Sequence, residues 1–344
     1  MKNPEKQDGA PFIVAELSAN HGGTLARAKK LVALASRAGV DAVKLQTYTP
    51  DTMTLNVKSD HFRIDKNHRL WGGRYLHDLY TEAHTPWEWH RTIYESAKDL
   101  GITAFSTPFD YTAVEFLESI DNPIYKIASI EIAHLPLIAK VAGTGKPLII
   151  STGAANLGEI DRAVETARHQ GADDITLMVC TSAYPANDID SNLSRIPLLQ
   201  EAFGAKVGFS DHTTGIGSAI AAVALGATVI EKHFKLNKKE TGVDSEFSVS
   251  PIEMAQLVLE CRNAHRALGS PNAWNLASES TSHDLRPSIH VSENVTRGEV
   301  ASAENLRICR PNGGLAPQAL SRLIGKKFSK SLNRGHPTQW SDFT

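Results

Sequence analysis

Short apolar runs alternate with amphipathic segments over most of the chain. Eight such runs occupy residues 12–20, 41–48, 103–109, 124–129, 147–152, 175–182, 206–212 and 227–234. Several of the segments between them place apolar residues at helical spacing, as at 24–39, 113–120, 157–171 and 217–226. Eight strand-then-helix units predict a (β/α)8 TIM barrel. An open doubly wound sheet is the alternative, but no GxGxxG motif follows the first strand.

The pattern changes after the eighth unit, which predicts a second domain. A helix over 251–269 runs into a Ser/Asn-rich stretch, and the remainder has short strands and frequent turn residues. We therefore expect a catalytic barrel over 1–269, a linker over 270–285 and a small domain over 286–344. About 60 residues bury little surface by themselves, so this domain is expected to pack against a barrel.

Composition excludes several classes of protein. Of the 344 residues, 41% are hydrophobic and 22% are charged, which is typical of globular proteins. The net charge of −2 and the absence of a basic block argue against a nucleic-acid partner. The three cysteines are far apart, and the N-terminus lacks the apolar core of a signal peptide. No membrane span is predicted, and a reducing, cytoplasmic compartment is the expectation.

Polar side chains fall in the last part of the predicted strands, where a TIM barrel builds its active site. These residues are Glu16, Lys44, Thr107, Lys126, Ser129, Ser151, Ser182, Ser210, His212, Glu231 and His233. Lys44 and Thr107 are separated by about twice the length of one strand–helix unit. The extra residues, 49–86, are polar with scattered aromatic residues and predict an elaborated loop over the barrel mouth.

Three charged residues interrupt apolar strands, and a buried charge needs a partner. Glu16, Lys44 and Lys126 could form structural ion pairs between neighbouring strands. Alternatively, the two lysines could form a socket for a phosphorylated carboxylate. The hydroxyl groups at the other strand ends favour this second interpretation, and they belong to Thr107, Ser129, Ser151 and Ser210.

Two histidines end adjacent strands, and two interpretations stay open. His212 and His233 could be hydrogen-bonded core residues, or they could bind a metal with open positions left for water or substrate. Two imidazoles with oxygen ligands suit Mn²⁺, with Mg²⁺ or Co²⁺ as alternatives. Asp244, in the loop after the eighth strand, is either part of a plain turn or a neighbour of that metal.

Ten strings along the chain resemble the sialic acid synthase family, and among its branches the pseudaminic acid branch. They are IVAELSANHGG, VKLQTYTPDTMTL, LYTEAHTPWEWH, FSTPFD, YKIAS, STGAAN, CTSAYPA, GFSDHTTG, VIEKHF and VDSEFSVSP. The C-terminal part is similar to the antifreeze-like SAF domain. The resemblance implies a transferase that condenses phosphoenolpyruvate with an acetamido sugar and releases phosphate by C–O cleavage.

The resemblance also implies roles for single residues. Phosphoenolpyruvate would be held by Lys44, Thr107, Lys126, Ser129, Ser151, Ser182 and Ser210, and Mn²⁺ by His212 and His233. Glu16 and Asp244 would lie beside the reacting carbons, with Glu16 as the preferred base. The sugar site would be lined by Asn20, Gln46, Tyr184 and Glu231.

The resemblance further implies a domain-swapped homodimer. The SAF domain of one subunit would cap the barrel of the other, and Arg310 would reach the sugar. The pseudaminic branch uses 2,4-diacetamido-2,4,6-trideoxy-L-altrose. N-acetylneuraminate or legionaminate synthesis from another acetamido sugar is one alternative, and a sugar-binding barrel without catalytic activity is another.

Overall fold

The computed structural model describes residues 9–274 and 276–344, and it contains the predicted barrel. Eight parallel strands pair in chain order, and the last closes on the first. They are β1 (Phe12–Glu16), β2 (Ala42–Thr47), β3 (Thr103–Pro108), β4 (Tyr125–Ile127), β5 (Leu148–Ser151), β6 (Ile175–Cys180), β7 (Lys206–Asp211) and β8 (Val229–His233). The prediction of a TIM barrel is therefore confirmed, and the open-sheet alternative is wrong.

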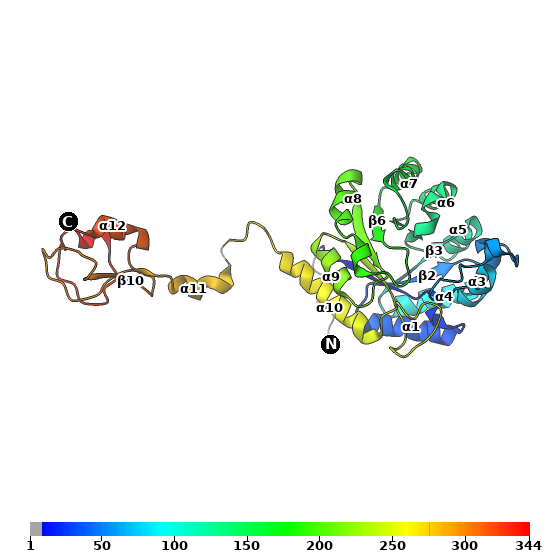
Figure 1. The fold of residues 1–344 in the computed structure, drawn as a ribbon, viewed down its shortest axis with the longest axis horizontal. Coiled ribbons are helices and arrows are strands. Elements are labelled where there is room, and N and C mark those ends of the chain that lie inside the picture. The colour runs from blue at the N-terminus through cyan, green and yellow to red at the C-terminus, as the bar shows by residue number, and fades with distance from the viewer. Residues whose placement is uncertain (1–8, 275) are drawn as a thin grey trace. The chain divides into compact units, whose positions relative to one another are not determined.

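The helices form a ring outside the strands (Figure 1). The main ones are α1 (Leu25–Ala38), α4 (Trp87–Asp99), α5 (Tyr111–Glu118), α6 (Leu135–Ala142), α7 (Leu157–His169), α8 (Arg195–Phe203), α9 (Gly217–Ala224) and α10 (Pro251–Leu268). Local signals fix their ends. Asn156 and Glu159 form a capping box that starts α7, and Gly39, at φ 87°, ends α1 in the left-handed region.

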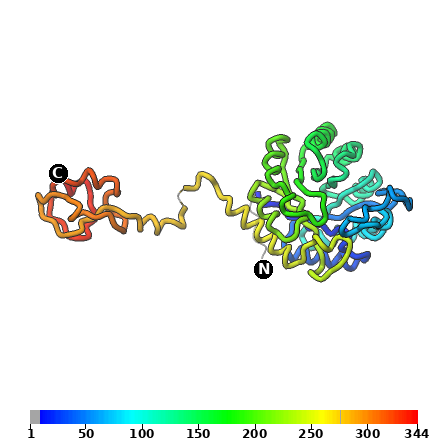
Figure 2. The backbone as a smooth tube through the Cα atoms, in the orientation of Figure 1, coloured from blue at the N-terminus to red at the C-terminus, as the bar shows by residue number. Residues whose placement is uncertain are grey.

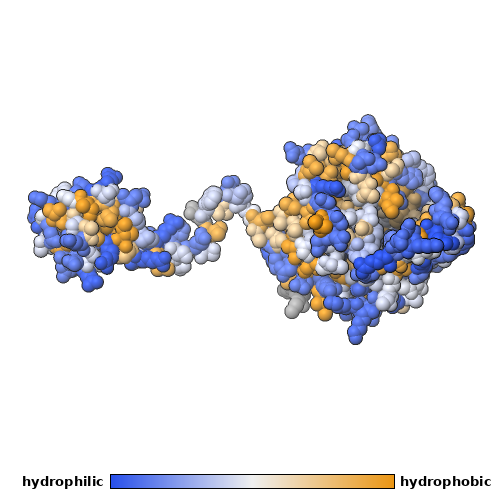
Figure 3. Space-filling view, viewed as in Figure 1, coloured by the Kyte–Doolittle hydropathy of each residue, from blue (hydrophilic) through white to orange (hydrophobic). Residues whose placement is uncertain are grey.

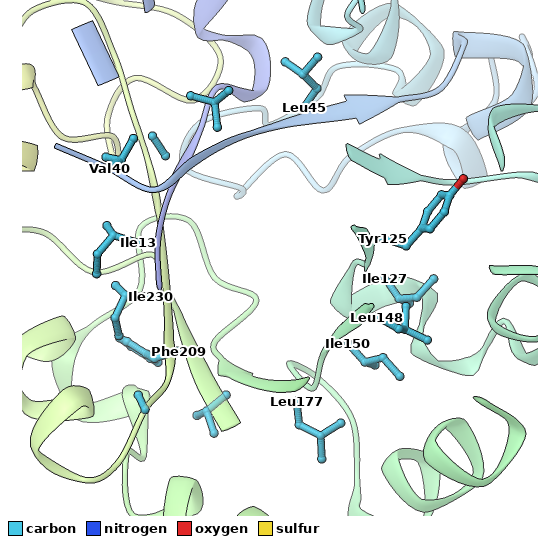
Figure 4. Packing of buried hydrophobic residues seen from close by; sticks show 14 of the residues in the cluster. Ile13, Val40, Leu45, Tyr125, Ile127, Leu148, Ile150, Leu177, Phe209 and Ile230 are labelled. Carbon is cyan, nitrogen blue, oxygen red and sulfur yellow. The ribbon is translucent and has the colours of Figure 1, made fainter. Parts of the chain in front are cut away.

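Side-chain alternation along the strands divides the core into two layers. Ile13 and Ala15 of β1 pack outward against the helices, whereas Val14 faces the barrel interior. Figure 4 shows the outer layer, in which Ile13 lies beside Ile230 of the paired strand β8. The apolar interior layer consists of Val14, Ala42, Phe105, Ile149, Met178 and Val229, with Phe12 and Ile124 packed against it. The same alternation directs polar residues into the barrel at the next inward-facing positions, nearer the carboxyl ends of the strands.

The inserted segment between β2 and α4 holds three short elements. They are α2 (Pro50–Met53), a 3-10 turn (Asp60–Phe62) and α3 (Leu76–Ala83). Its tip reaches the loop after β8, where the indole N–H of Trp71 donates to the carbonyl oxygen of Val243 over 3.0 Å. Arg69 forms an ion pair with Glu246 of the same loop. The insertion is therefore anchored at the carboxyl end of the barrel.

The described chain divides into two units, one ending at Leu268 and the other beginning at Gly269. Figure 2 follows the backbone through both. The second unit contains α11 (Ser280–Asp284), the antiparallel pair β9 (Ser288–Val291) and β10 (Leu306–Cys309), and α12 (Leu320–Leu323). It has a small core of its own, centred on Ile289, Leu323 and Phe328.

Helices that could cross a bilayer are absent from the described residues, since no helix there is both long and apolar enough. In the space-filling view, hydrophobic residues on the visible face of the barrel unit are scattered among hydrophilic ones (Figure 3).

Asp211 and Lys232 form a fully buried ion pair, which gives a testable expectation about stability. The two charged atoms are 2.7 Å apart, and both side chains are 0% exposed. The Lys232 ammonium also donates to the carbonyl oxygen of Thr213 over 2.8 Å. Replacing Asp211 by alanine leaves the ammonium without its counter-charge, so we expect unfolding free energy to fall by about 3 kcal/mol.

Urea unfolding followed by circular dichroism measures this loss. The matched control is Asp174→Ala, because Asp174 pairs with Lys206 over 2.9 Å at the surface, with side chains 50% and 61% exposed. The control should lose less than about 1 kcal/mol. Equal losses in the two variants would contradict the assignment of Asp211 to the stability of the barrel.

Candidate active site

The predicted site residues of the barrel gather at the carboxyl ends of its strands. Most lie on the strands themselves, while Ser129, Ser182 and His212 come just after β4, β6 and β7. The strand register brings Glu16 level with Lys44 on one side and with His233 on the other. Parallel strands and inward-facing alternation thus bring residues distant in sequence to one end of the barrel.

Two lysines and two glutamates form a buried network in this space. The Lys44 ammonium forms an ion pair with Glu16, lies 3.7 Å from Glu231 Oε1, and donates to Thr107 Oγ1 over 3.1 Å. The Lys126 ammonium also lies 3.7 Å from Glu231 Oε1. The ion pair between neighbouring strands is therefore present, and it forms part of a larger charged cluster.

Burial and mutual charge set the protonation of this network. Burial raises the pKa of Glu16 to about 7, although Lys44 opposes the shift. Burial alone would raise the pKa of Glu231, but Lys126 and Lys44 lower it by more. The pKa of Glu231 is therefore lowered, and Glu231 stays ionised. Burial also lowers the pKa of Lys126, whereas for Lys44 the two glutamates outweigh burial and raise it. The cluster thus combines an ionised carboxylate with one that can exchange a proton near neutral pH.

Beside the lysines, small polar groups line a narrow space around Gly153. A Cβ atom at this glycine would lie 2.5 Å from Ser182 Oγ, 2.7 Å from Cys180 Sγ and 2.9 Å from Ser129 Oγ. Among the described residues, the buried Ser182 Oγ has no hydrogen-bond partner. Ser151 is buried at the end of β5. Hydroxyl groups around a backbone without a side chain suit a bound anion. Gly153 was not predicted from the sequence, because a single glycine after a strand is equally typical of an ordinary turn.

The two histidines fit a divalent metal. Their ring centroids are 5.5 Å apart. His212 Nδ1 bonds to the carbonyl oxygen of Thr181 over 2.8 Å, which fixes the ring and leaves Nε2 available as a ligand. His233 Nδ1 is buried and has no hydrogen-bond partner within the described residues. Burial lowers the pKa of both rings, for His233 together with its neighbour His212, so both are neutral as metal ligands must be.

In the described part of the chain, no group of three His, Cys, Asp or Glu side chains could hold a metal. A metal at this pair would therefore have two protein ligands and several positions open to water or substrate. Such open coordination is typical of catalytic sites rather than structural ones.

Ser18 connects the two candidate catalytic carboxyl groups and was not predicted. Its hydroxyl contacts Asp244, and its backbone N–H donates to Glu16 Oε1 over 2.8 Å. Ala19 N–H donates to Asp244 as well, over 3.2 Å. Ser18 has a φ of 42°, a left-handed conformation that is rare for residues other than glycine. Backbone strain of this kind persists at functional sites when surrounding contacts hold it in place.

Asp244 is held by Ser18 and Ala19, which follow β1 directly in the chain. Burial raises its pKa, although its bonds to Ser18 and Ala19 oppose the shift. Burial therefore favours the protonated form of this carboxyl group more than water does.

The residues predicted to line the sugar site differ in what they can offer a ligand. The amide of Asn20 is already bonded to Phe234 O, Ser248 and Ser245, so this side chain organises the loop that carries Asp244. Gln46 lies 3.5 Å from Glu16 Oε1 and is half-buried. The ring of Tyr184 is centred 4.5 Å from that of His212, so Tyr184 lies beside the histidine pair.

Arg310 belongs to the second unit, where it follows β10 and is exposed. With Arg307 and Arg334 it lines a surface groove of about 340 Å³. Three arginines around one groove make this surface a candidate contact for an anionic or polar group.

Comparisons with known proteins show the family of the chain. Residues 31–273 match the NeuB family, and residues 286–344 match the SAF domain. The chain is 41% identical over 336 residues to the pseudaminic acid synthase of Campylobacter jejuni, covering 98% of this chain and 97% of that protein. It is 36% identical over 334 residues to the N,N'-diacetyllegionaminic acid synthase of Legionella pneumophila, covering 96% and 93%.

A solved structure gives the same result for the fold. The N-acetylneuraminic acid synthetase of Leptospira borgpetersenii superposes with a TM-score of 0.71 at 31% identity, over 82% of this chain and 93% of that one. The resemblance seen in the ten sequence strings is thus confirmed over nearly the whole chain, and the chain belongs to the NeuB family.

Proposed function

We propose that the chain acts as a pseudaminic acid synthase. It condenses phosphoenolpyruvate with 2,4-diacetamido-2,4,6-trideoxy-L-altrose to give pseudaminic acid and phosphate. The observation that carries this proposal is the meeting of Lys44, Lys126 and Glu231 with the neutral histidine pair at one end of the barrel. Similarity to the Campylobacter jejuni enzyme supports the choice of sugar.

Phosphoenolpyruvate binds between the two lysines and the hydroxyl groups beside Gly153. Its phosphate and carboxylate need several cationic and neutral donors in a site without bulk water. Those donors are Lys44, Thr107, Lys126, Ser129, Ser151, Ser182 and Ser210. The lysines hold the phosphate in place as a leaving group. They also stabilise the negative charge that the phosphate gains when it leaves.

The reaction forms one carbon–carbon bond and breaks one carbon–oxygen bond. C3 of phosphoenolpyruvate bonds to the aldehyde carbon of the sugar, water adds to C2, and the C2–O bond breaks to release phosphate. Glu16 accepts the proton of the attacking water. Asp244, whose pKa is raised, provides a proton for the former aldehyde oxygen, and Ser18 holds both carboxyl groups in position.

His212 and His233 would hold the divalent metal, for which we propose Mn²⁺. A metal bound there supplies Lewis-acid polarisation of a carbonyl oxygen. Tyr184 and Phe247 pack beside the two rings, with Phe247 centred 4.8 Å from His233.

The pKa of Glu16 predicts how activity depends on pH. Because burial raises this pKa to about 7, the group is protonated, and inactive as a base, below neutral pH. We expect kcat/KM to fall about tenfold per pH unit below 7. Steady-state rates between pH 5.5 and 8.5 measure the profile.

The matched variant is Glu16→Gln, which keeps the shape of the side chain but cannot accept a proton. It should lower kcat by about 10² to 10⁴-fold and remove the acidic limb. An unchanged acidic limb in Glu16→Gln would show that another group is the base.

We also propose a cytoplasmic, domain-swapped homodimer in which Arg310 of one subunit completes the sugar site of the other. Its exposure on the second unit and the free state of the three cysteines support this arrangement and compartment. Mixing inactive Arg310→Ala with inactive Lys126→Ala should restore activity through hybrid sites. No recovery after demonstrated subunit exchange would contradict the swap.

The experiment that tests the proposed function measures phosphate release with three sugars. The 2,4-diacetamido-2,4,6-trideoxy sugars of the altro and manno series and N-acetylmannosamine are compared at equal concentration. The altro sugar should give the highest kcat/KM. Preference for either other sugar would reassign the enzyme to legionaminate or N-acetylneuraminate synthesis, and binding without turnover would leave only a sugar-binding barrel.

A further inference from the structure

A row of aromatic rings leads from the histidine pair to the inserted segment. Tyr184 is centred 4.5 Å from His212, and Trp71 is centred 5.9 Å from Tyr184. Phe247 flanks the row, 5.1 Å from Tyr184. The mechanism above assigns no role to Trp71, which is contributed by the insertion rather than by a strand end.

Trp71 is held in place from two sides. Its indole N–H donates to Val243 O over 3.0 Å, and the ring of His68 stacks on it at 4.9 Å with an interplanar angle of 10°. The ion pair between Arg69 and Glu246 fastens the same tip of the insertion to the loop after β8. Trp71 remains partly exposed, so part of this fixed, largely apolar side chain is open to a ligand.

The position of the sugar follows from the proposed function, on which this inference rests. The aldehyde carbon reacts near the histidines, so the other end of the six-carbon chain extends outward past Tyr184. Because Val243 O already occupies the indole N–H, the open part of Trp71 offers carbon atoms and no free hydrogen-bond donor. A hydroxymethyl group placed there would lose its bonds to water without replacement, whereas a methyl group would gain apolar contact.

We propose that Trp71 is a specificity-determining residue that contacts the C6 methyl group of a 6-deoxy sugar and disfavours a C6 hydroxyl. The insertion between β2 and α4 thereby selects the substrate, while the strand ends perform the chemistry.

The test compares the 6-deoxy diacetamido sugar with its 6-hydroxy counterpart. In Trp71→Ala, kcat/KM for the 6-deoxy sugar should fall about 10 to 30-fold, mainly through KM, which is the range for losing contact with a small apolar group. The value for the 6-hydroxy sugar should change less than about threefold, and KM for phosphoenolpyruvate less than about twofold. The preference for the 6-deoxy sugar therefore shrinks.

Two further variants separate contact from folding. Trp71→Phe keeps an apolar ring and should keep the preference, while Trp71→Gln supplies an amide and should raise the relative turnover of the 6-hydroxy sugar. Thermal unfolding of each variant is measured alongside. Trp274→Ala, at a tryptophan that is 83% exposed outside the barrel, is the control and should leave both sugars unaffected.

The outcomes distinguish the two proposals. If the wild-type enzyme turns over the 6-deoxy sugar but Trp71→Ala and Trp71→Gln keep its preference, the role of Trp71 is wrong and the proposed function stands. If the wild-type enzyme releases no phosphate with any acetamido sugar, the proposed function is wrong, and the inference fails with it.

Discussion

Replacing Lys126 by methionine should lower kcat/KM for phosphoenolpyruvate about 10³-fold, or about 4 kcal/mol of transition-state stabilisation. The ammonium is buried at the end of β4, and burial has already removed its hydration. A trianionic substrate in the same space would lose one of two cationic partners, with no water to compensate. Calorimetric titration with phosphoenolpyruvate should show a matching loss of affinity.

The control for this substitution is Lys140→Met. Lys140 lies on α6 and pairs with Glu115 at the surface over 3.1 Å, so the same chemical change should alter kcat/KM less than about twofold. Circular dichroism verifies that both variants are folded. If Lys126→Met kept its kcat/KM within tenfold of the wild type, the lysine pair would not be the phosphoenolpyruvate site.

Substituting either histidine of the pair should abolish both metal binding and turnover. On the proposed function, His212→Ala and His233→Ala each remove one of the two metal ligands that the described residues offer, so we expect Mn²⁺ affinity to fall more than about 100-fold. Activity should fall about 10³-fold or more, and treatment of the wild type with a chelator should have the same effect until Mn²⁺ is restored. Electron paramagnetic resonance of bound Mn²⁺ reports binding independently of activity.

The exposed His169 on α7 provides the matched control, and His169→Ala should bind Mn²⁺ like the wild type. Full activity after complete removal of divalent metal would contradict the role of the pair. So would wild-type Mn²⁺ affinity in both His212→Ala and His233→Ala.

The barrel and the positions of the candidate residues at its strand ends could be predicted from the sequence because both follow strand periodicity. Parallel strands of a TIM barrel end at one face, and alternate residues point inward. Glu16 sits two positions after the interior Val14, and Lys44 two after Ala42, so an interior charge at a strand end is visible as a break in an apolar run. The contact between Glu16 and Lys44 follows from the register alone.

The loops carry no such periodicity, and the residues that were missed lie there. Ser18 meets Asp244 across 226 positions, and Trp71 meets Val243 across 172. Both contacts depend on irregular backbone, including the left-handed conformation of Ser18, which hydrophobic patterning does not encode. Asn20 stays a predicted residue of the sugar site, and its amide also bonds to Phe234 O and Ser248, contacts that only the folded loops reveal.

The most direct test of the central claim follows the bridging oxygen of phosphoenolpyruvate. The wild-type enzyme is supplied with Mn²⁺, the altro sugar and phosphoenolpyruvate carrying ¹⁸O between C2 and phosphorus, and the released phosphate is analysed by mass spectrometry. Cleavage of the C2–O bond after attack of water at C2 predicts that all of the label leaves with phosphate. Unlabelled phosphate would mean that water attacks phosphorus, and the roles assigned to the two lysines and Glu16 would be wrong.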